Sequence, residues 1–263
     1  MAVIKMYQAD AFTDRLFSGN PAAVCLTDEW LTDELMQNIA AENNLAETAF
    51  LVKSGDHYEI RWFTPTVEVD LCGHATLASA CVLFEREGVN EAVINLYSPR
   101  SGELKVTKEE GMLFLDFPTD QLQRVKPQPD LLPCIGFQSA EVYKGKTDFI
   151  AFLNTEEEIR ALVPDFYEIS RLDIRGLIVT APGDEVDFVS RCFFPQCGID
   201  EDPVTGSAHT SLVPLWSEKL RKREMMARQL SRRGGTIYCS YHGERCRIGG
   251  KAVIYMSGEI YIS

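Results

Sequence analysis

Apolar residues recur along the chain with two periodicities, and each periodicity predicts one kind of secondary structure. Apolar residues three and four positions apart predict helices near 31–43, beginning at a Thr32 cap, and near 74–87, ending at Gly88. Short apolar or alternating runs are typical of strands. In the first half such runs lie near 3–9, 22–27, 47–53, 58–64, 92–98, 103–108 and 112–117.

The second half shows the same kinds of element. Helices are predicted near 155–163 and from Gly206 onward, and the basic run from Lys219 to Arg233 is interpreted as a further helix with a solvated face. The segment 121–133, with three prolines, is the best candidate for a crossing between domains. Strands are predicted near 141–143, 148–153, 175–181, 186–194, 235–241, 244–249, 251–256 and 259–262.

Two stretches 130 residues apart (61 to 191) share one pattern. Arg-Trp-Phe-Thr-Pro at 61–65 leads to Gly-His-Ala at 73–75, and Arg-Cys-Phe-Phe-Pro at 191–195 leads to Gly-Ser-Ala at 206–208. Each copy reads as a strand, a loop with acidic residues, and a helix that opens with small residues. Helix N-termini attract anions, so two such ends facing each other about a pseudo-two-fold axis would hold a small acid in a cleft.

These patterns predict an α+β fold with two pseudo-symmetric domains. A helix that is apolar on most faces needs cover on most sides, so each domain is expected to curl a mostly antiparallel sheet, or a barrel, around one central helix. The predicted domains are residues 1–118 and 119–263, with the strands near 250–263 as candidates to complete the first. Each domain is long enough to bury its own core.

Composition narrows the classes of function. The formal net charge of −13 argues against a nucleic-acid partner, and no window approaches the roughly 18 apolar residues of a membrane span. The N-terminus lacks the pattern of an export signal, so a cytoplasmic location is expected. The eight cysteines form no Cys-x-x-Cys pair and are expected to be free thiols. Cys192, Cys197 and His209 are only a weak metal pattern, and no metal is expected.

Several polar residues lie at strand or helix ends, where they are candidates for catalysis or substrate binding. Glu47 lies at the mouth of an apolar strand, where a carboxylate loses hydration; the alternative is a solvent-facing strand end. His74 opens a helix whose field favours a neutral ring, and a capping role is the alternative. Asp202 precedes a Pro, and the alternative for it is a turn residue. Gly206, without a Cβ, allows a ligand to approach the backbone.

Six motifs together resemble the phenazine-biosynthesis PhzF-like isomerase family. The resemblance spans the whole chain and implies the diaminopimelate epimerase fold, an active site between the two domains, no cofactor, and commonly a homodimer. The motifs are Asp-Ala-Phe-Thr at 10–13, Phe-Ser-Gly-Asn-Pro-Ala-Ala-Val at 17–24, Glu-Thr-Ala-Phe at 47–50, Arg-Trp-Phe-Thr-Pro at 61–65, Cys-Gly-His-Ala at 72–75 and Asp-Pro-Val-Thr-Gly-Ser-Ala at 202–208.

The resemblance also implies roles for individual residues. Glu47 falls where the family's proton-shuttling carboxylate lies, with His74 in contact with the substrate and Asp202 as an assisting group. The substrate is expected to be a small carboxylic or amino-acid-like molecule, and the reaction an isomerisation or tautomerisation. The residues expected to bind it are Gly19, Asn20, Gly73, Gly206 and Ser207.

Two alternatives remain open from the sequence. Related epimerases use one thiol from each domain; this chain keeps Cys72, but the matching segment at 202–206 has no cysteine. An amino-acid epimerase would therefore need Cys72 with Glu47 as an unconventional pair. The second alternative is a non-catalytic module that binds a small acid. Enzymes of phenazine producers resemble Ala-Gly-His-Pro where this chain has Cys-Gly-His-Ala at 72–75, so the phenazine substrate itself does not follow from the resemblance.

Overall fold

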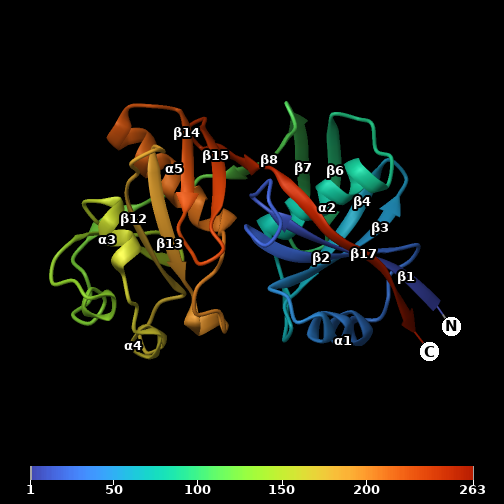
Figure 1. The fold of residues 1–263 in the computed structure, drawn as a ribbon, viewed down its shortest axis with the longest axis horizontal. Helices are drawn as coiled ribbons and strands as arrows, with labels where there is room; N and C mark the ends of the chain where they lie inside the picture. The colour runs from blue at the N-terminus through green and yellow to red at the C-terminus, as the bar shows by residue number, and fades with distance from the viewer. Residues whose placement is uncertain (1, 263) are drawn as a thin grey trace. The chain divides into compact units, whose positions relative to one another are not determined.

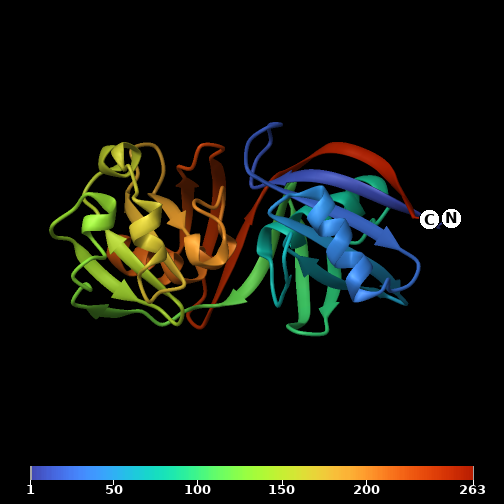
Figure 2. The same cartoon turned by 90° about the horizontal axis from the view of Figure 1, so that it is seen from below.

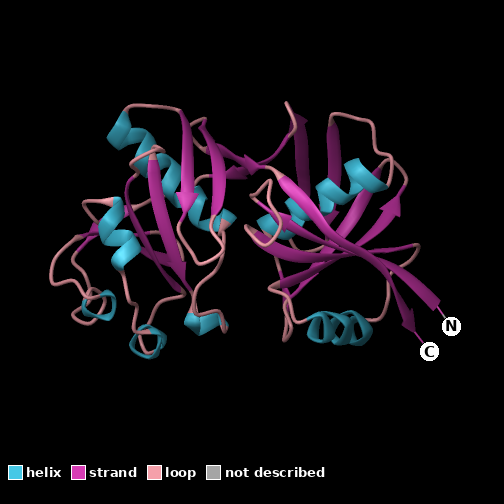
Figure 3. Cartoon of the chain, in the orientation of Figure 1, coloured by secondary structure: helices cyan, strands magenta, loops and turns pink. Residues whose placement is uncertain are grey.

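The computed structural model describes residues 2–262, and the chain divides into two compact units (Figure 1). The first unit holds the residues up to Asp116 together with those from Gly249 onward, and the second holds Phe117–Ile248. Strands outnumber helices in both units (Figure 3), which confirms the predicted α+β class. No helix among residues 2–262 is long and apolar enough to cross a bilayer.

The first unit wraps its strands around one buried helix, α2 (Gly73–Arg86). Every residue from His74 to Leu83 is buried, so this helix needs cover all round, and β1, β2, β3 and β17 pack against it (Figure 1). The chain turns away at Gly88, whose φ is +71°. The strands of this unit are β1 (Ala2–Ala11), β2 (Asn20–Thr27), β3 (Glu47–Ser54), β4 (His57–Phe63), β5 (Glu68–Val69), β6 (Val93–Ser98), β7 (Gly102–Glu109) and β17 (Ala252–Ile262), with β8 (Met112–Pro118) and β16 (Arg245–Gly250) crossing the unit boundaries.

A second helix, α1 (Asp33–Asn43), covers the outer face of this sheet (Figure 2). Its Met36 and Ile39 pack with Phe50 of β3 in one apolar cluster. Because α2 lies against β3 as well, β3 is buried over most of its length, and its start is held in a fixed place. Glu47 is the first residue of β3.

The second unit is built around α5 (Gly206–Leu220), most of which is buried. Trp216 of this helix stacks on Phe188, with ring centroids 5.3 Å apart, and its Nε1 donates to Thr180 Oγ1 at 2.9 Å. The other elements are β9 (Gln123–Val125), the 3₁₀ turns η1 (Pro133–Ile135) and η2 (Pro195–Cys197), β10 (Glu141–Lys144), β11 (Asp148–Phe152), α3 (Glu156–Ala161), α4 (Phe166–Ser170), β12 (Gly176–Pro182), β13 (Phe188–Phe193), β14 (Glu224–Gln229) and β15 (Gly235–Tyr241).

The two units repeat one order of strand pairings. In the first, β1–β2, β3–β4 and β6–β7 are antiparallel and β2–β3 and β4–β6 are parallel. In the second, β10–β11, β12–β13 and β14–β15 are antiparallel and β11–β12 and β13–β14 are parallel. A parallel pair needs a crossover connection, and α2 and α5 occupy the same crossover in their units.

Side chains repeat as well. Arg61 Nε and Nη2 donate to the two carboxylate oxygens of Glu68 at 2.7 and 2.8 Å. Arg191 makes the matching pair with Glu201 at 2.7 and 3.0 Å. Each glutamate lies five positions before the glycine that begins the central helix. The two copies therefore share this ion pair as well as their order of strands.

Two local expectations are wrong. The basic run from Lys219 to Arg233 is not a helix: α5 ends at Leu220, and β14 carries Met225 and Ala227 into the core on alternate positions. The segments near 251–256 and 259–262 are one strand, β17, which pairs with β1 through Gly258 without a turn. In the sequence, a glycine in the middle of a long strand cannot be distinguished from a glycine at a turn.

Candidate active site

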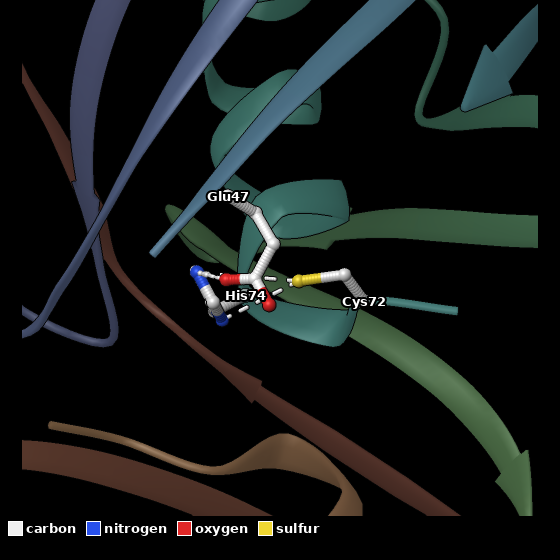
Figure 4. Close-up of side chains that lie close together, drawn as sticks. All are labelled: Glu47, Cys72 and His74. Carbon is white, nitrogen blue, oxygen red and sulfur yellow. Dashed lines mark hydrogen bonds and ion pairs between the residues drawn. The ribbon is translucent and has the colours of Figure 1, made fainter. Parts of the chain in front are cut away.

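Glu47 and His74 come together in the first unit (Figure 4). Glu47 begins β3 and His74 is the second residue of α2; their side chains are 13% and 7% exposed. Glu47 Oε2 lies 3.1 Å from His74 Nε2. The contact brings the charges together but lacks the alignment of a hydrogen bond, and Oε2 has no hydrogen-bond partner among the described residues.

Cys72 adjoins the same pair. It precedes the first turn of α2, and its Sγ lies 3.5 Å from His74 Nδ1 and 3.9 Å from Nε2 (Figure 4). Burial, together with the charge of Glu47, raises the pKa of the Cys72 thiol. A thiol with a raised pKa stays protonated near neutral pH, so Cys72 is a poor base.

Asn20 supports the imidazole from the opposite edge. Its Nδ2 lies 3.2 Å from His74 Nδ1 and, as a donor, leaves Nδ1 as the acceptor and the ring proton on Nε2 toward Glu47. Turning the amide presents Oδ1 instead and accommodates a ring protonated on both nitrogens. Gly19 places Asn20 through a left-handed turn with φ +67°, where a Cβ would lie 2.2 Å from the carbonyl oxygen of Ala11.

The charge of His74 differs from the sequence prediction. Burial alone disfavours the imidazolium, but the neighbouring Cys72 and Glu47 outweigh it and raise the pKa of His74 well above its usual value. Since the Cys72 thiol is itself neutral, we attribute the shift to the Glu47 carboxylate. The prediction of a neutral ring considered the field of the helix and missed a carboxylate 3.1 Å away.

The N-termini of α2 and α5 differ from those of the other helices. Thr32, Thr155 and Asp165 cap α1, α3 and α4 with their side chains, and each of those helices has an acidic residue in its first turn. Within the described residues α2 and α5 have neither a side-chain cap nor a first-turn acid. Gly73 and Gly206, both predicted to bind substrate, are the first residues of these two helices, whose amides suit an anion.

The predicted residues of the second unit lie around the start of α5. Asp202 is 9% exposed, and its Oδ2 accepts a hydrogen bond of 2.5 Å from Thr205 Oγ1. Gly206 is buried and Ser207 is exposed. Asn20, Glu47 and His74 thus form one cluster in the first unit, which also holds Gly19 and Gly73, and the second unit holds Asp202, Gly206 and Ser207.

His209, part of the weak metal pattern in the sequence, is a packed histidine, and a different group of side chains has the spacing of metal ligands. His209 is fully buried, donates from Nδ1 to the carbonyl of Thr205 at 2.8 Å, and has a pKa lowered to about 4 by burial, as expected for a packed histidine. Among residues 2–262 the one group of three side chains able to hold a metal ion is Glu47, Cys72 and His74, whose ligand atoms lie within 4.8 Å of one another. Such a set suits a soft divalent ion such as zinc.

Two residues that contact the loop before α5 were not predicted from the sequence. Thr205 bonds to Asp202, and Gln229 bonds to both through its side-chain amide. Thr205 was visible as the residue before a helix-opening glycine, a usual cap position. Gln229 carried no signal, because one polar residue in a basic run is read as solvated.

Comparisons with known proteins agree over the full length of the chain. The family model described as "Phenazine biosynthesis-like protein" matches residues 9–258. A protein of Pseudomonas aeruginosa named an uncharacterized isomerase is 49% identical over 99% of both chains. The crystal structure of a phenazine biosynthesis protein of the PhzF family from Enterococcus faecalis has a TM-score of 0.96 at 46% identity and covers 99% of this chain and 100% of its own. A hydroxyproline epimerase from Agrobacterium vitis, 12% identical over 98% and 92% of the chains, has a TM-score of 0.66 and shows the shared fold alone.

Proposed function

The chain belongs to the phenazine biosynthesis-like family, which includes relatives named isomerases, and on this premise we propose that it is an isomerase that moves a proton within a small carboxylic acid by means of Glu47. No cofactor is needed for the step. The substrate class is a carboxylic or amino-acid-like molecule, and His74 is the residue that supports the Glu47 carboxylate.

One observation carries the proposal: Glu47 Oε2 is buried without a hydrogen-bond partner among residues 2–262, with a histidine 3.1 Å away. The His74 imidazolium offsets part of the cost of burying this charge, but no hydrogen bond from the described residues satisfies the oxygen. A buried polar atom without a hydrogen-bond partner is unusual in a folded protein and is often explained by a catalytic role. A substrate C–H brought to the Glu47 carboxylate would meet a base that has little water to displace.

The proposed step balances without any redox partner. Glu47 removes a proton from carbon, the C–H electron pair enters the adjacent π system, and the protonated Glu47 returns the proton to another carbon of that system on the same face. A double bond moves, and substrate and product have the same atoms. The imidazolium of His74 stabilises the carboxylate before the transfer, and we assign it contact with the substrate because the family resemblance implies that role.

Substrate binding is assigned to the two uncapped helix N-termini. The first-turn amides at Gly73 and at Gly206 and Ser207 suit carboxylate oxygens, and Asp202 suits an amine or assists the proton transfer. Asn20 acts by holding the His74 ring in place through its contact with Nδ1. These roles follow from the resemblance and from local geometry within each unit.

The raised pKa of Cys72 favours Glu47 over the thiol as base, so the epimerase alternative is the weaker one. A binding module remains distinguishable by experiment. We would incubate dihydro-hydroxyanthranilate, diaminopimelate and trans-4-hydroxy-L-proline with the protein in D2O and follow isomerisation and carbon-bound deuterium by proton NMR. Glu47→Gln is the test variant and Glu42→Gln, at an exposed position in α1, the control.

Turnover that Glu42→Gln keeps and Glu47→Gln loses by about 10²-fold or more supports the proposal. Turnover unaffected by Glu47→Gln contradicts it, as does turnover lost only with Cys72→Ser. Binding of an acid without turnover by the unaltered protein would favour the binding module.

A further inference from the structure

We infer that Gln229, the last residue of β14, is a positioning residue for the Asp202 carboxylate and for the first turn of α5. The inference rests on the proposed function in one respect, since it takes Asp202 to act on substrate. Its geometric part stands on contacts within the second unit alone.

The side-chain amide of Gln229 joins both ends of the loop from Asp202 to Thr205. Its Oε1 accepts from the backbone N–H of Thr205 at 2.9 Å, and its Nε2 donates to the backbone carbonyl of Asp202 at 2.7 Å and to Thr205 Oγ1 at 3.1 Å. Thr205 Oγ1 then donates to Asp202 Oδ2 at 2.5 Å. A chain of hydrogen bonds therefore runs from Gln229 to the carboxylate.

The amide of Gln229 is buried, and both of its polar atoms are bonded. Its side chain is 0% exposed, its acceptor has one partner and its amino group has two. A buried amide bonded at both ends has one stable orientation, because rotating it would place donor against donor and acceptor against acceptor. Gln229 thus fixes the Thr205 hydroxyl as a donor toward Asp202.

The position of Gln229 is set by the sheet. Gln229 in β14 pairs with Ser190 in the parallel neighbour β13. The next residue, Leu230, donates from its N–H to the Ser190 carbonyl at 2.7 Å. Ser231 adds a second tie, donating from Oγ to the carbonyl of Pro203 at 2.7 Å. The loop before α5 is consequently held by a rigid strand end, as a group acting on substrate requires.

The Thr205 bond also leaves the helix start available. Thr205 is the N-cap residue of α5, yet its hydroxyl bonds to Asp202 and does not cap the first turn. The Gln229 side chain occupies the N–H of Thr205 itself. The following amides, at Gly206 and Ser207, are those assigned to the substrate carboxylate.

The test compares Gln229→Leu with Gln196→Leu. Gln196 also donates from a side-chain amide to backbone carbonyls of the second unit, but its acceptors are Ile169 and Leu172 and not the loop before α5. Backbone hydrogen exchange over 202–206 measures the loop, and thermal unfolding checks that each variant is folded. The kcat and KM of the proton-transfer reaction measure the consequence, with Asp202→Asn measured in parallel.

We expect Gln229→Leu to lose the exchange protection of the Thr205 amide and to lower kcat by about 10- to 100-fold, with a smaller rise in KM from the displaced first turn of α5. Gln196→Leu should change neither the protection nor kcat. Unchanged protection of Thr205 in a folded Gln229→Leu protein overturns the inference, as does lost protection with kcat intact. Full activity in Asp202→Asn would instead contradict the role proposed for Asp202, and the exchange result would still decide whether Gln229 holds the loop.

Discussion

His74 Nε2 lies 3.1 Å from Glu47 Oε2, although the two residues come from different elements, the start of β3 and the start of α2. Both side chains are largely buried, so neither charge is well screened by solvent. The carboxylate therefore stabilises the imidazolium, and the pKa of His74 is raised well above its usual value. This relationship links the proposed chemistry to a measurable property of the folded state.

The raised pKa of His74 predicts how stability depends on pH. A histidine whose pKa is higher in the folded state contributes stability that is fully present below its unfolded pKa of about 6.5. That contribution is lost as pH rises through the folded pKa. Urea unfolding between pH 6.5 and 8 should show the unaltered protein losing stability relative to His74→Gln, with a limiting slope of about 1.4 kcal/mol per pH unit.

The same measurement on His57→Gln serves as the control, because His57 lies beside an exposed Asp56 rather than a buried carboxylate. Staying at or below pH 8 avoids ionisation of unfolded thiols near about 8.5. A stability difference between the protein and His74→Gln that is constant over this range would contradict the assigned pKa direction.

Cys72 is predicted to be dispensable for the proton transfer. Because burial raises its pKa, the thiol is protonated and is a poor substitute for Glu47, the proposed base. Cys72→Ser keeps a small neutral donor and should keep kcat within about tenfold, whereas loss of a general base costs about 10²–10⁴. Deuterium incorporation by NMR measures both. A loss in Cys72→Ser as large as that in Glu47→Gln would restore the epimerase alternative.

The repeated motif is a reliable guide to the fold because its residues interact with one another. Arg61 lies over the ring of Phe63 at 5.2 Å, and Arg191 lies over Phe193 at the same distance. Each arginine also bonds to the glutamate five positions before the central helix. Such local dependencies leave a visible pattern, which is sufficient to predict two similar halves.

Other features depend on contacts between distant segments and leave no pattern. Gln229 bonds to Asp202 across 27 positions (229 minus 202), and nothing nearby in the chain distinguishes it from a solvated polar residue. The pairing of β17 with β1 joins opposite ends of the chain, so Gly258 has the appearance of a turn in the sequence. The charge of His74 likewise depends on Glu47, 27 positions earlier (74 minus 47).

Gly19 is predicted to be intolerant of a side chain. Its φ of +67° is unfavourable for other residues, and a Cβ would lie 2.2 Å from the carbonyl oxygen of Ala11. Gly19→Ala should therefore lower the free energy of unfolding by about 2–3 kcal/mol and displace Asn20 from His74. Urea denaturation measures the first effect and a crystal structure of the variant the second.

Gly55 provides the matched control for Gly19. It has a similar φ of +61°, but nothing lies within 4 Å of the position that a Cβ would occupy, so Gly55→Ala should cost only the backbone strain of about 1–2 kcal/mol. Equal losses for Gly19→Ala and Gly55→Ala would show that the Ala11 carbonyl yields, and that the turn before Asn20 is not held as tightly as proposed.

Arg191 is predicted to stabilise the second unit more than its surface counterparts do. Its side chain is 12% exposed, pairs with both oxygens of Glu201, and donates from Nη1 to the carbonyl of Leu162 at 2.9 Å. Arg191→Ala leaves a largely buried carboxylate and a carbonyl without these donors, which should lower the free energy of unfolding by about 2–4 kcal/mol. Arg228, 39% exposed and paired with Glu185, which is 74% exposed, is the control, and its removal should cost less than about 1 kcal/mol. Urea denaturation at low and high salt separates the two, because salt weakens the exposed pair and leaves the buried one almost unchanged. If Arg191→Ala lowered the free energy of unfolding no more than Arg228→Ala does, the repeated arginine would not stabilise the loop that carries Asp202.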